Sequence, residues 1–282
     1  MKELIKNIRL NANMSQEQFA GELGTTSLSI NRWENGKTLP NRMAQTQLYN
    51  FCVEHNIDVA SLIIDSKVYP NSNKDKLVLY HGSKKGIDGE VKPISRNECD
   101  FGKGFYMGTS TLQPLTLICN ENKPKFYAVE LDMTGLNVLT VDISMDWAML
   151  IAYYRKEMES AKGTPIYEKY ANMAKGYDLV IGYIANDRMY TELSRFFNRT
   201  LTDVALINCL SALDLGKQYV AISEKACRQI KILQEQPLSP LELALLKDMS
   251  AARRKEGIAL AEEIEIKYRR EGKYFDEILR GE

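Results

Sequence analysis

Two short stretches, YHGS at residues 80–83 and DFGKGFY at residues 100–106, carry the strongest structural signal in this 282-residue chain. Both contain glycine, which lets a backbone approach a ligand closely or adopt a positive φ. The first adds the imidazole of His81 and the second the ring of Tyr106, about one strand-loop-strand apart. An imidazole donor and a flat ring beside such a backbone suit a planar amide and a ribose. The pair therefore predicts a site for the nicotinamide riboside part of a dinucleotide.

Together, the two stretches resemble the NAD-binding half of the ADP-ribosyltransferases. The pattern is similar to that of the poly(ADP-ribose) polymerases and the diphtheria-toxin-like enzymes, in which His-Gly-Ser precedes Phe-Gly-Lys-Gly-aromatic-Tyr. A bacterial family of domains of unknown function is more similar still. The resemblance covers residues 77–235. It implies a split pair of small sheets, a split β-sandwich, with a cleft for NAD as co-substrate.

The resemblance also implies a role for each residue. His81 would bond a hydroxyl of the adenosine-side ribose, and the backbone of Gly82 would pair with the carboxamide. Ser83 would complete the amide clamp or bond the adjacent ribose, and Tyr106 would stack on nicotinamide. Lys103 would lie near the opening of the cleft. Cofactor contacts are accordingly expected at His81, Gly82, Ser83, Arg96, Phe101, Gly102, Gly104 and Tyr106.

One position departs from the family pattern, because Gln218 stands where a glutamate begins a late strand. Glutamine accepts a bond from a ribose hydroxyl but provides neither charge nor base. Losing such a charge in a dry site costs about 2–4 kcal/mol of transition-state stabilisation. Asp187 and Glu224 are candidate replacements, although Asp187 has the structural alternatives of pairing with Arg188 or capping a helix. The expected catalytic set is His81, Tyr106, Gln218 and Asp187.

The second aromatic ring that holds nicotinamide in the family has no counterpart, since Leu115 and Leu117 occupy the matching region. With both this ring and the glutamate missing, chain elongation into a polymer is not expected. The resemblance then favours a mono-ADP-ribosyltransferase, a glycosyltransferase that moves one ADP-ribose unit to an unknown macromolecular acceptor.

Short apolar runs predict the strands of the larger domain, and helical spacing separates some of them. Strands and helices mixed without strict alternation favour an α+β fold. Strands are predicted at residues 77–80, 104–107, 126–131, 136–141, 178–184 and 218–222, and helices at 145–159, 189–197 and 202–213.

Residues 1–66 have a different pattern, of short helices separated by turns. Ser15 and Gln18 predict a capping box, Gly24 a helix end, and Thr26 the cap of a third helix. Residues 3–65 resemble the Cro/C1-type phage-repressor helix-turn-helix family. The resemblance implies base contacts from Ser27, Leu28 and Arg32, and phosphate contacts from Gln16, Thr26, Asn35 and Lys37.

Two features of this segment keep a second interpretation open. Leu28 replaces the polar residue usual at its position, which leaves fewer hydrogen bonds to bases. Residues 1–70 also hold 7 basic and 7 acidic residues, so no basic excess favours nucleic acid. A helical module that has lost DNA affinity and instead docks a partner or dimerises is the alternative.

Composition excludes several other classes of protein. The formal net charge is zero, and the five cysteines show no C-x-x-C spacing, so we expect neither a zinc site nor a disulfide framework. No apolar run reaches membrane-spanning length, and the first residues lack a signal-peptide core. We therefore expect a cytoplasmic bacterial protein with no membrane partner.

Segment boundaries follow from changes in composition. The polar residues 67–76 are a predicted linker, and residues 77–236 form the expected NAD-binding domain. Residues 237–282 are a predicted helical extension that begins at Ser239, Pro240 and Glu242. This extension is either a solvated helical hairpin on its own domain or a surface for an antitoxin or a second copy.

Three functions are compatible with these patterns. The first is an NAD-dependent mono-ADP-ribosyltransferase fused to a DNA-binding helix-turn-helix, acting as a toxin or defence effector. The second is a transcription regulator that senses NAD or ADP-ribose through a non-catalytic cleft. The third is an interaction module of a toxin–antitoxin complex in which both sites are idle.

Overall fold

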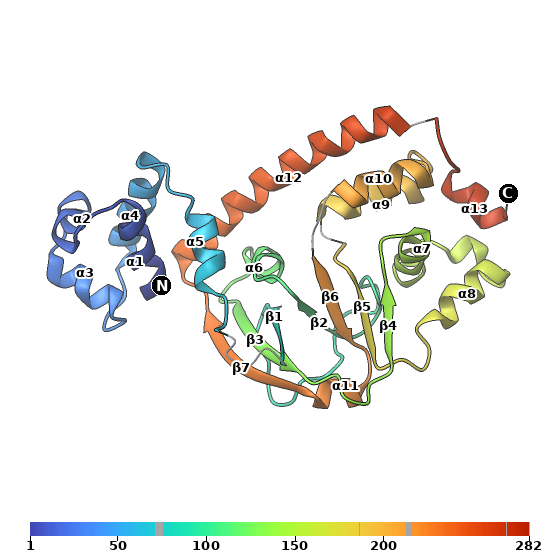
Figure 1. The fold of residues 1–282 in the computed structure, drawn as a ribbon, viewed down its shortest axis with the longest axis horizontal. Helices are drawn as coiled ribbons and strands as arrows, with labels where there is room; N and C mark the ends of the chain where they lie inside the picture. The colour runs from blue at the N-terminus through green and yellow to red at the C-terminus, as the bar shows by residue number, and fades with distance from the viewer. Residues whose placement is uncertain (71–75, 186, 213–215, 269, 282) are drawn as a thin grey trace.

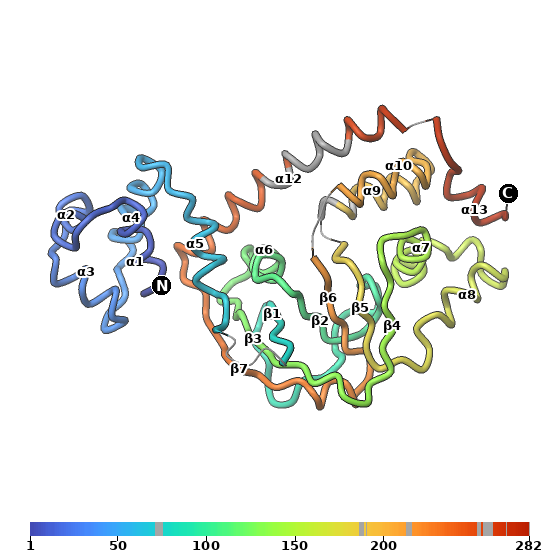
Figure 2. Tube along the Cα trace, viewed as in Figure 1, coloured from blue at the N-terminus to red at the C-terminus, as the bar shows by residue number. Residues whose placement is uncertain are grey.

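The computed structural model describes residues 1–70, 76–185, 187–212, 216–268 and 270–281. Within the helices it does not describe the side chains of residues 187, 188, 190, 253, 254 and 256–261. Part of the predicted linker, residues 71–75, therefore lies outside the described residues. So do the side chains of Asp187 and of Ile258 and Ala261, two apolar residues of the predicted C-terminal helical extension. Figures 1 and 2 show the N-terminal helices beside a twisted sheet that carries helices, with one long helix crossing both.

The N-terminal segment forms the helices expected of a helix-turn-helix. They are α1 (Lys2–Asn11), α2 (Gln16–Glu22), α3 (Ser27–Glu34), α4 (Arg42–Glu54) and α5 (Val59–Ser66). The reciprocal capping box between Ser15 and Gln18 is confirmed, and the Thr26 side chain caps α3. Gly24 has a φ of 58°, the left-handed conformation expected where α2 ends.

The larger domain is built on one mixed sheet, and its α+β class is confirmed. Its seven described strands have the order β4-β5-β6-β2-β1-β3-β7. Only β4 and β5 run parallel; the other neighbours are antiparallel. The strands are β1 (Leu77–Ser83), β2 (Phe105–Gly108), β3 (Lys125–Leu131), β4 (Val138–Val141), β5 (Leu179–Tyr183), β6 (Lys217–Ala221) and β7 (Ile230–Pro237).

The expected split of the sheet takes the form of a narrow junction between two halves. β1 pairs with β3 along its whole length, and β2 pairs with β6 along its whole length. By contrast, β1 and β2 share the single registered pair Tyr80↔Gly108. We call the line between β1 and β2 the seam. The strands thus form one hydrogen-bonded sheet whose halves β4-β5-β6-β2 and β1-β3-β7 separate beyond that pair.

Alternation along the strands gives the sheet two unlike faces. The helix-covered face carries α6 (Leu112–Ile118) on one half, and α7 (Met145–Tyr154), α9 (Asp187–Phe197) and α10 (Asp203–Ala212) on the other. The opposite face is closed by α11 (Glu224–Arg228) and by Ile87 and Val91 from the loop after β1. The remaining segments α8 (Pro165–Met173) and a 3₁₀ turn at Glu159–Ala161 lie after α7.

The N-terminal helices and the β1-β3-β7 half share one hydrophobic core. Phe19, Leu48 and Phe51 belong to the same buried cluster as Tyr80 and Phe126 of the sheet. A separate cluster fills the other half, around Trp147, Phe196 and Val220. The helix-turn-helix is therefore packed onto the half of the sheet that carries His81.

A single long helix, α12 (Pro240–Tyr268), replaces the hairpin that was one alternative for the C-terminal segment. It packs on α4, α5 and α6 near its start and on α9 and α10 further along, so it spans both halves (Figure 1). The predicted start is confirmed: Ser239 Oγ accepts from Glu242 N at 3.2 Å, and Glu242 Oε2 accepts from Ser239 N at 2.8 Å. The short α13 (Phe275–Arg280) follows.

Glu242 also anchors this helix to the N-terminal segment. Lys67 Nζ lies 2.7 Å from Glu242 Oε1, and both side chains are buried. Lys67, which composition assigned to the linker, thus closes α5 and joins the interface with α12. No described helix is both long enough and apolar enough to cross a bilayer.

Four helices and strands of the larger domain were not predicted from sequence: β7, α6, α8 and the short α11. β7 is an edge strand, exposed over most of its length, so its apolar residues do not alternate strongly. α6 and α8 each hold only two or three turns, and a proline lies within or at the start of each. Short helices of this kind are stabilised mainly by the sheet they cover.

Candidate functional site

His81 lies at the seam and bridges its two strands. Its Nδ1 is 2.7 Å from the carbonyl oxygen of Tyr106, and its ring stacks on Phe105 with centroids 4.2 Å apart. Burial, opposed by this hydrogen bond, lowers the pKa of His81 to about 4, so the ring is neutral at pH 7. A carbonyl only accepts, so Nδ1 carries the proton and Nε2 is left as an acceptor. The imidazole therefore offers an acceptor, not the donor that the sequence suggested.

The backbone of β1 beyond Tyr80 has no registered partner on β2. If the ladder continued, Gly82 would stand opposite Tyr106; instead the Tyr106 carbonyl accepts from the His81 side chain. Backbone N–H and C=O groups at such an edge can pair with an added strand or with an amide. A planar amide therefore fits this edge.

Gly82 also has a packing role that the sequence did not predict. A Cβ at this position would lie 2.6 Å from the Pro114 carbonyl oxygen and 2.8 Å from Ile118 Cγ2, so the glycine admits α6. Next to it, Ser83 closes a local turn: its Oγ donates to Gly86 O at 2.9 Å and accepts from Gly86 N at 3.0 Å. One acceptor lone pair of this hydroxyl remains for a ligand.

Tyr106 lies on the other face of the sheet from the His81 ring. Neighbouring residues of a strand point in opposite directions, and the imidazole stacks on Phe105. The Tyr106 hydroxyl donates to Gly102 O at 2.7 Å and accepts from Phe101 N at 3.0 Å. Burial and then the nearby Asp100 carboxylate raise the pKa of this phenol. The expectation that the two rings line one groove is therefore wrong; they meet only through the Tyr106 backbone.

The loop before β2 is partly core and partly surface. Phe101 was expected in the wall of the cleft, but it is buried and its ring packs on Gly182. Gly102 has a φ of 73°, which explains the glycine in the turn. A Cβ at Gly104 would lie 2.5 Å from Val220 Cγ1, so this glycine allows β6 to approach. Arg96 and Lys103 are exposed.

Gln218 is buried and tied to an acid that sequence reasoning passed over. Its Nε2 donates to Asp100 Oδ2 at 3.1 Å and to Tyr183 O at 3.0 Å. Asp100 Oδ1 accepts from Arg155, whose Nε lies at 3.2 Å, and Oδ2 accepts from Ala185 N at 3.3 Å. Gln218 of β6 lies opposite Gly108 of β2, which in turn lies opposite Tyr80 of β1. The network is therefore level with the one residue pair that joins the two halves of the sheet.

The two acids proposed as replacements for the family glutamate have different fates. Asp187 begins α9, and its side chain lies outside the described residues. Glu224 follows the other end of β6 from Gln218; it is exposed and pairs with Arg228. Of the leucines in place of the second aromatic ring, Leu115 is buried in the core and Leu117 is 62% exposed.

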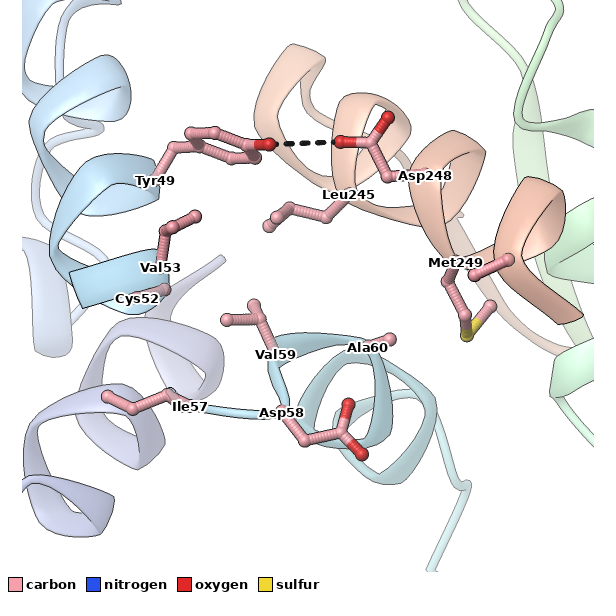
Figure 3. Close-up of a pocket in the computed structure, with 11 residues that line it drawn as sticks. Tyr49, Cys52, Val53, Ile57, Asp58, Val59, Ala60, Leu245, Asp248 and Met249 are labelled. Carbon is pink, nitrogen blue, oxygen red and sulfur yellow. Dashed lines mark hydrogen bonds between the residues drawn. The ribbon is translucent and has the colours of Figure 1, made fainter. Parts of the chain in front are cut away.

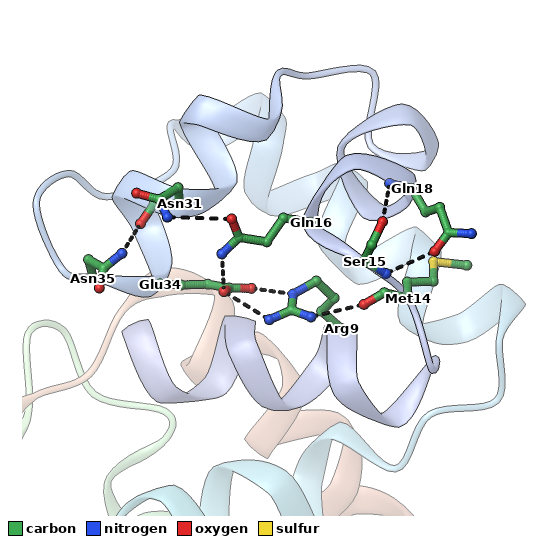
Figure 4. A network of polar contacts seen from close by, with 8 residues as sticks. All are labelled: Arg9, Met14, Ser15, Gln16, Gln18, Asn31, Glu34 and Asn35. Atoms are coloured by element: carbon green, nitrogen blue, oxygen red, sulfur yellow. Dashed lines mark hydrogen bonds and ion pairs between the residues drawn. The ribbon is translucent and has the colours of Figure 1, made fainter.

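In the helix-turn-helix, a buried polar network holds α1, α2 and α3 together (Figure 4). Arg9 donates to both carboxylate oxygens of Glu34, at 2.7 and 3.0 Å, and to Met14 O at 2.9 Å. Gln16 Nε2 donates to Glu34 Oε2 at 2.7 Å. Burial alone would raise the pKa of Glu34, but the bonds from Arg9 and Gln16 outweigh it and lower that pKa.

The residues assigned to DNA fall into two groups. Ser27, Leu28, Arg32 and Lys37 are exposed on α3 and the turn after it, on the side away from buried Ile30 and Trp33. The other three have partners within the domain. Gln16 belongs to the network above, Thr26 caps α3, and Asn35 Nδ2 donates to Asn31 O at 2.8 Å.

A separate hollow lies between the N-terminal helices and α12 (Figure 3). Its volume is about 360 Å³, and apolar side chains such as Val53 and Leu245 predominate in its lining. At one end, the Tyr49 hydroxyl donates to Asp248 Oδ2 at 3.1 Å. Neither the seam nor the predicted DNA contacts contribute to it.

Asp100, Arg155 and Glu34 are the polar residues that sequence reasoning missed. Asp100 immediately precedes the quoted Phe-Gly-Lys-Gly run, and a charged residue directly before a buried phenylalanine is a usable signal. Arg155 lies 55 residues further along the chain, and nothing in the pattern links it to Asp100. Glu34 ends the third helix predicted from sequence, α3, where a charged side chain usually faces solvent.

Comparison with protein families found two matches. The model of a family described as helix-turn-helix matches residues 5–42, and that of a family described as a protein of unknown function (DUF3990) matches residues 77–232. Neither curated proteins nor solved structures gave a match. The first match supports the Cro/C1-type helix-turn-helix expected at the N-terminus and indicates a DNA-binding regulator.

Proposed function

Because this chain belongs to the family of proteins of unknown function (DUF3990), we propose its function from its own site. The larger domain binds NAD at the seam and transfers one ADP-ribose unit to a macromolecule, and the helix-turn-helix directs it to DNA. The observation that carries this proposal is the seam: β1 and β2 separate after Tyr80↔Gly108 and leave a backbone edge beside a neutral histidine.

The open edge of β1 suits the nicotinamide end of NAD. A carboxamide has one donor end and one acceptor end, as a backbone amide does, so it can extend the edge at Gly82 without any charged side chain. Nε2 of His81 and the remaining lone pair of Ser83 Oγ both accept, as ribose hydroxyls require. Arg96 and Lys103 are exposed on the neighbouring loop, where they can meet a pyrophosphate.

In the proposed reaction, the bond between the ribose C1′ and the pyridinium nitrogen of nicotinamide breaks. Nicotinamide leaves as a neutral molecule with the bonding electron pair, and a nucleophile of the acceptor bonds C1′. The proton of that nucleophile passes to water, since Gln218 is no base. With an amide in place of a carboxylate, the site provides less charge stabilisation to the cation-like transition state, so we expect slow transfer.

Transfer is tested by incubating the full chain with NAD labelled in its adenylate phosphate, cell extract and DNA. The expected result is label on a macromolecule, lost in His81→Ala and retained in His55→Ala. His55 is the only other histidine of the chain and lies at the end of α4. Label that persists in His81→Ala, or no label together with no NAD binding, would contradict the proposal.

The neutral Gln218 favours a second function, in which the seam binds NAD or ADP-ribose as a signal and catalyses nothing. This regulator would bind NAD in calorimetry without releasing nicotinamide, and NAD would change its affinity for DNA. Release of nicotinamide that depends on His81 would exclude it.

A further inference from the structure

Among the residues of α3, all of which the structure describes, Leu28 is the one large apolar side chain left exposed. It is 58% exposed, whereas Ile30 and Trp33 of the same helix are buried in the core. Leu28 is the second residue of α3, and the N-terminal residues of a recognition helix are those that contact base edges in the major groove. Leu28 is therefore available to a partner of α3.

The charge on the exposed surface of α3 is positive. Arg32 follows Leu28 by one helical turn, and Lys37 lies in the turn after the helix; both cations are exposed. Glu34, the one acid of α3, points inward, where Arg9 donates to both of its carboxylate oxygens (Figure 4). This surface is therefore complementary to the phosphates of a nucleic acid, although the N-terminal segment has no basic excess overall.

Few polar side chains of α3 are left to form hydrogen bonds with bases. The hydroxyl of Ser29 bonds that of the cap residue Thr26, and the amide of Asn31 donates to a glutamine of α2. Within α3 as described, Ser27 and Arg32 are the exposed polar residues whose side chains form no hydrogen bond in the fold. One serine and one arginine distinguish few base pairs, so an apolar contact can supply much of any sequence preference.

An apolar side chain can recognise one feature of a base pair in the major groove, which is the C5-methyl group of thymine. We propose that Leu28 reads one thymine of the DNA site through this methyl group. Arg32, about 6 Å further along α3, is placed to meet another base of the same half-site, for which guanine is the favoured partner. This inference rests on the DNA-directing part of the function proposed above and does not involve NAD.

The test uses DNA that the full chain selects from a random pool. Each thymine of the selected site is replaced in turn by uracil, which removes the methyl group and leaves the hydrogen-bonding edge of the base unchanged. In gel-shift titrations, the unaltered chain should bind one of these duplexes about fourfold more weakly, the effect of losing contact with one buried methyl group. Leu28→Ala should bind the thymine and uracil duplexes with equal affinity.

Leu10→Ala is the matched control, because Leu10 is an apolar residue of α1 that is 51% exposed. It should keep the preference for thymine over uracil. Leu28→Gln places an amide at the same exposed position, and a glutamine amide can bond both N6 and N7 of adenine. Selection repeated with Leu28→Gln should therefore return a site in which adenine replaces that thymine.

Each outcome decides between two levels of the proposal. Equal affinity of the unaltered chain for the thymine and uracil duplexes overturns the role of Leu28 and leaves DNA binding intact. A preference that persists in Leu28→Ala, or a selected site that is unchanged in Leu28→Gln, does the same. A chain that selects no sequence from the pool overturns the DNA-directing part of the proposed function as well, whereas the transfer of ADP-ribose is tested separately with labelled NAD.

Discussion

The helix-turn-helix and the seam are built in opposite ways. In the helix-turn-helix, the polar network of Arg9, Gln16 and Glu34 is buried beneath α3, and the predicted base-reading residues Ser27, Leu28 and Arg32 are exposed above it. At the seam, the polar groups themselves form the candidate site, from strands far apart in the sequence. We therefore expect a substitution in the helix-turn-helix to change either the free energy of unfolding or DNA binding. A substitution at the seam should change both the free energy of unfolding and NAD binding.

The largest expected effect comes from restoring the family glutamate on β6, the strand next to β2. Gln218→Glu would put a carboxylate beside buried Asp100 and the Tyr183 carbonyl, which removes two hydrogen bonds and adds a like-charge contact. We expect a loss of about 4 kcal/mol in the free energy of unfolding. Denaturant titration measures it.

Gln18→Glu is the matched change in the helix-turn-helix. Gln18 closes the capping box of α2, where a glutamate serves equally well and favours the helix dipole. It should be neutral or stabilise by about 0.5 kcal/mol. Equal effects of the two substitutions would remove the contrast between the regions.

The buried ion pair of the helix-turn-helix gives the next effect. Glu34→Gln leaves Arg9 without its carboxylate and should cost about 3 kcal/mol of unfolding free energy. Glu3→Gln, which breaks the exposed pair with Lys2, should cost less than about 0.5 kcal/mol. Thermal unfolding of the two variants compares these losses. If Glu34→Gln were as stable as the unaltered chain, the network would not organise α3.

The histidine of the seam predicts a pH dependence of stability. The folded pKa of His81 is about 4, below the ordinary value of 6.5, so the folded state favours the neutral ring. The contribution of His81 to the free energy of unfolding is complete above pH 6.5 and is lost as the pH falls toward 4. The unaltered chain should lose about 2 kcal/mol more over this window than His81→Gln. Identical pH profiles for the two chains would mean that the ring titrates normally.

The smallest effect concerns the surface of α3. Arg32→Ala should weaken binding to DNA selected from a random pool by about 1–2 kcal/mol, and Lys37→Ala should reduce the salt dependence by about one counterion. Unfolding should not change, because both side chains are exposed. Lys103→Ala, an exposed lysine of the larger domain, is the control in gel-shift assays. Unchanged DNA binding in Arg32→Ala would support the alternative of a docking module.

The contrast also explains what could be predicted from the sequence. Caps such as Ser15 and Thr26 act within three residues, so the helices were predictable from local pattern. The six predicted strands were found because each has a buried side. The directions of the side chains at the seam were not predictable from sequence. They depend on how β1 meets β2, and these two strands share only the pair Tyr80↔Gly108. The Asp100–Gln218 bond joins residues 118 positions apart, and no local pattern encodes it.

The most direct test of the seam as an NAD site is a crystal structure of the full chain with NAD bound. The expected result is a nicotinamide carboxamide paired with the backbone of Gly82, and a ribose hydroxyl within hydrogen-bond distance of His81 Nε2. NAD seated elsewhere, such as the hollow between α4, α5 and α12, or β1 and β2 closed against the ligand, would contradict it.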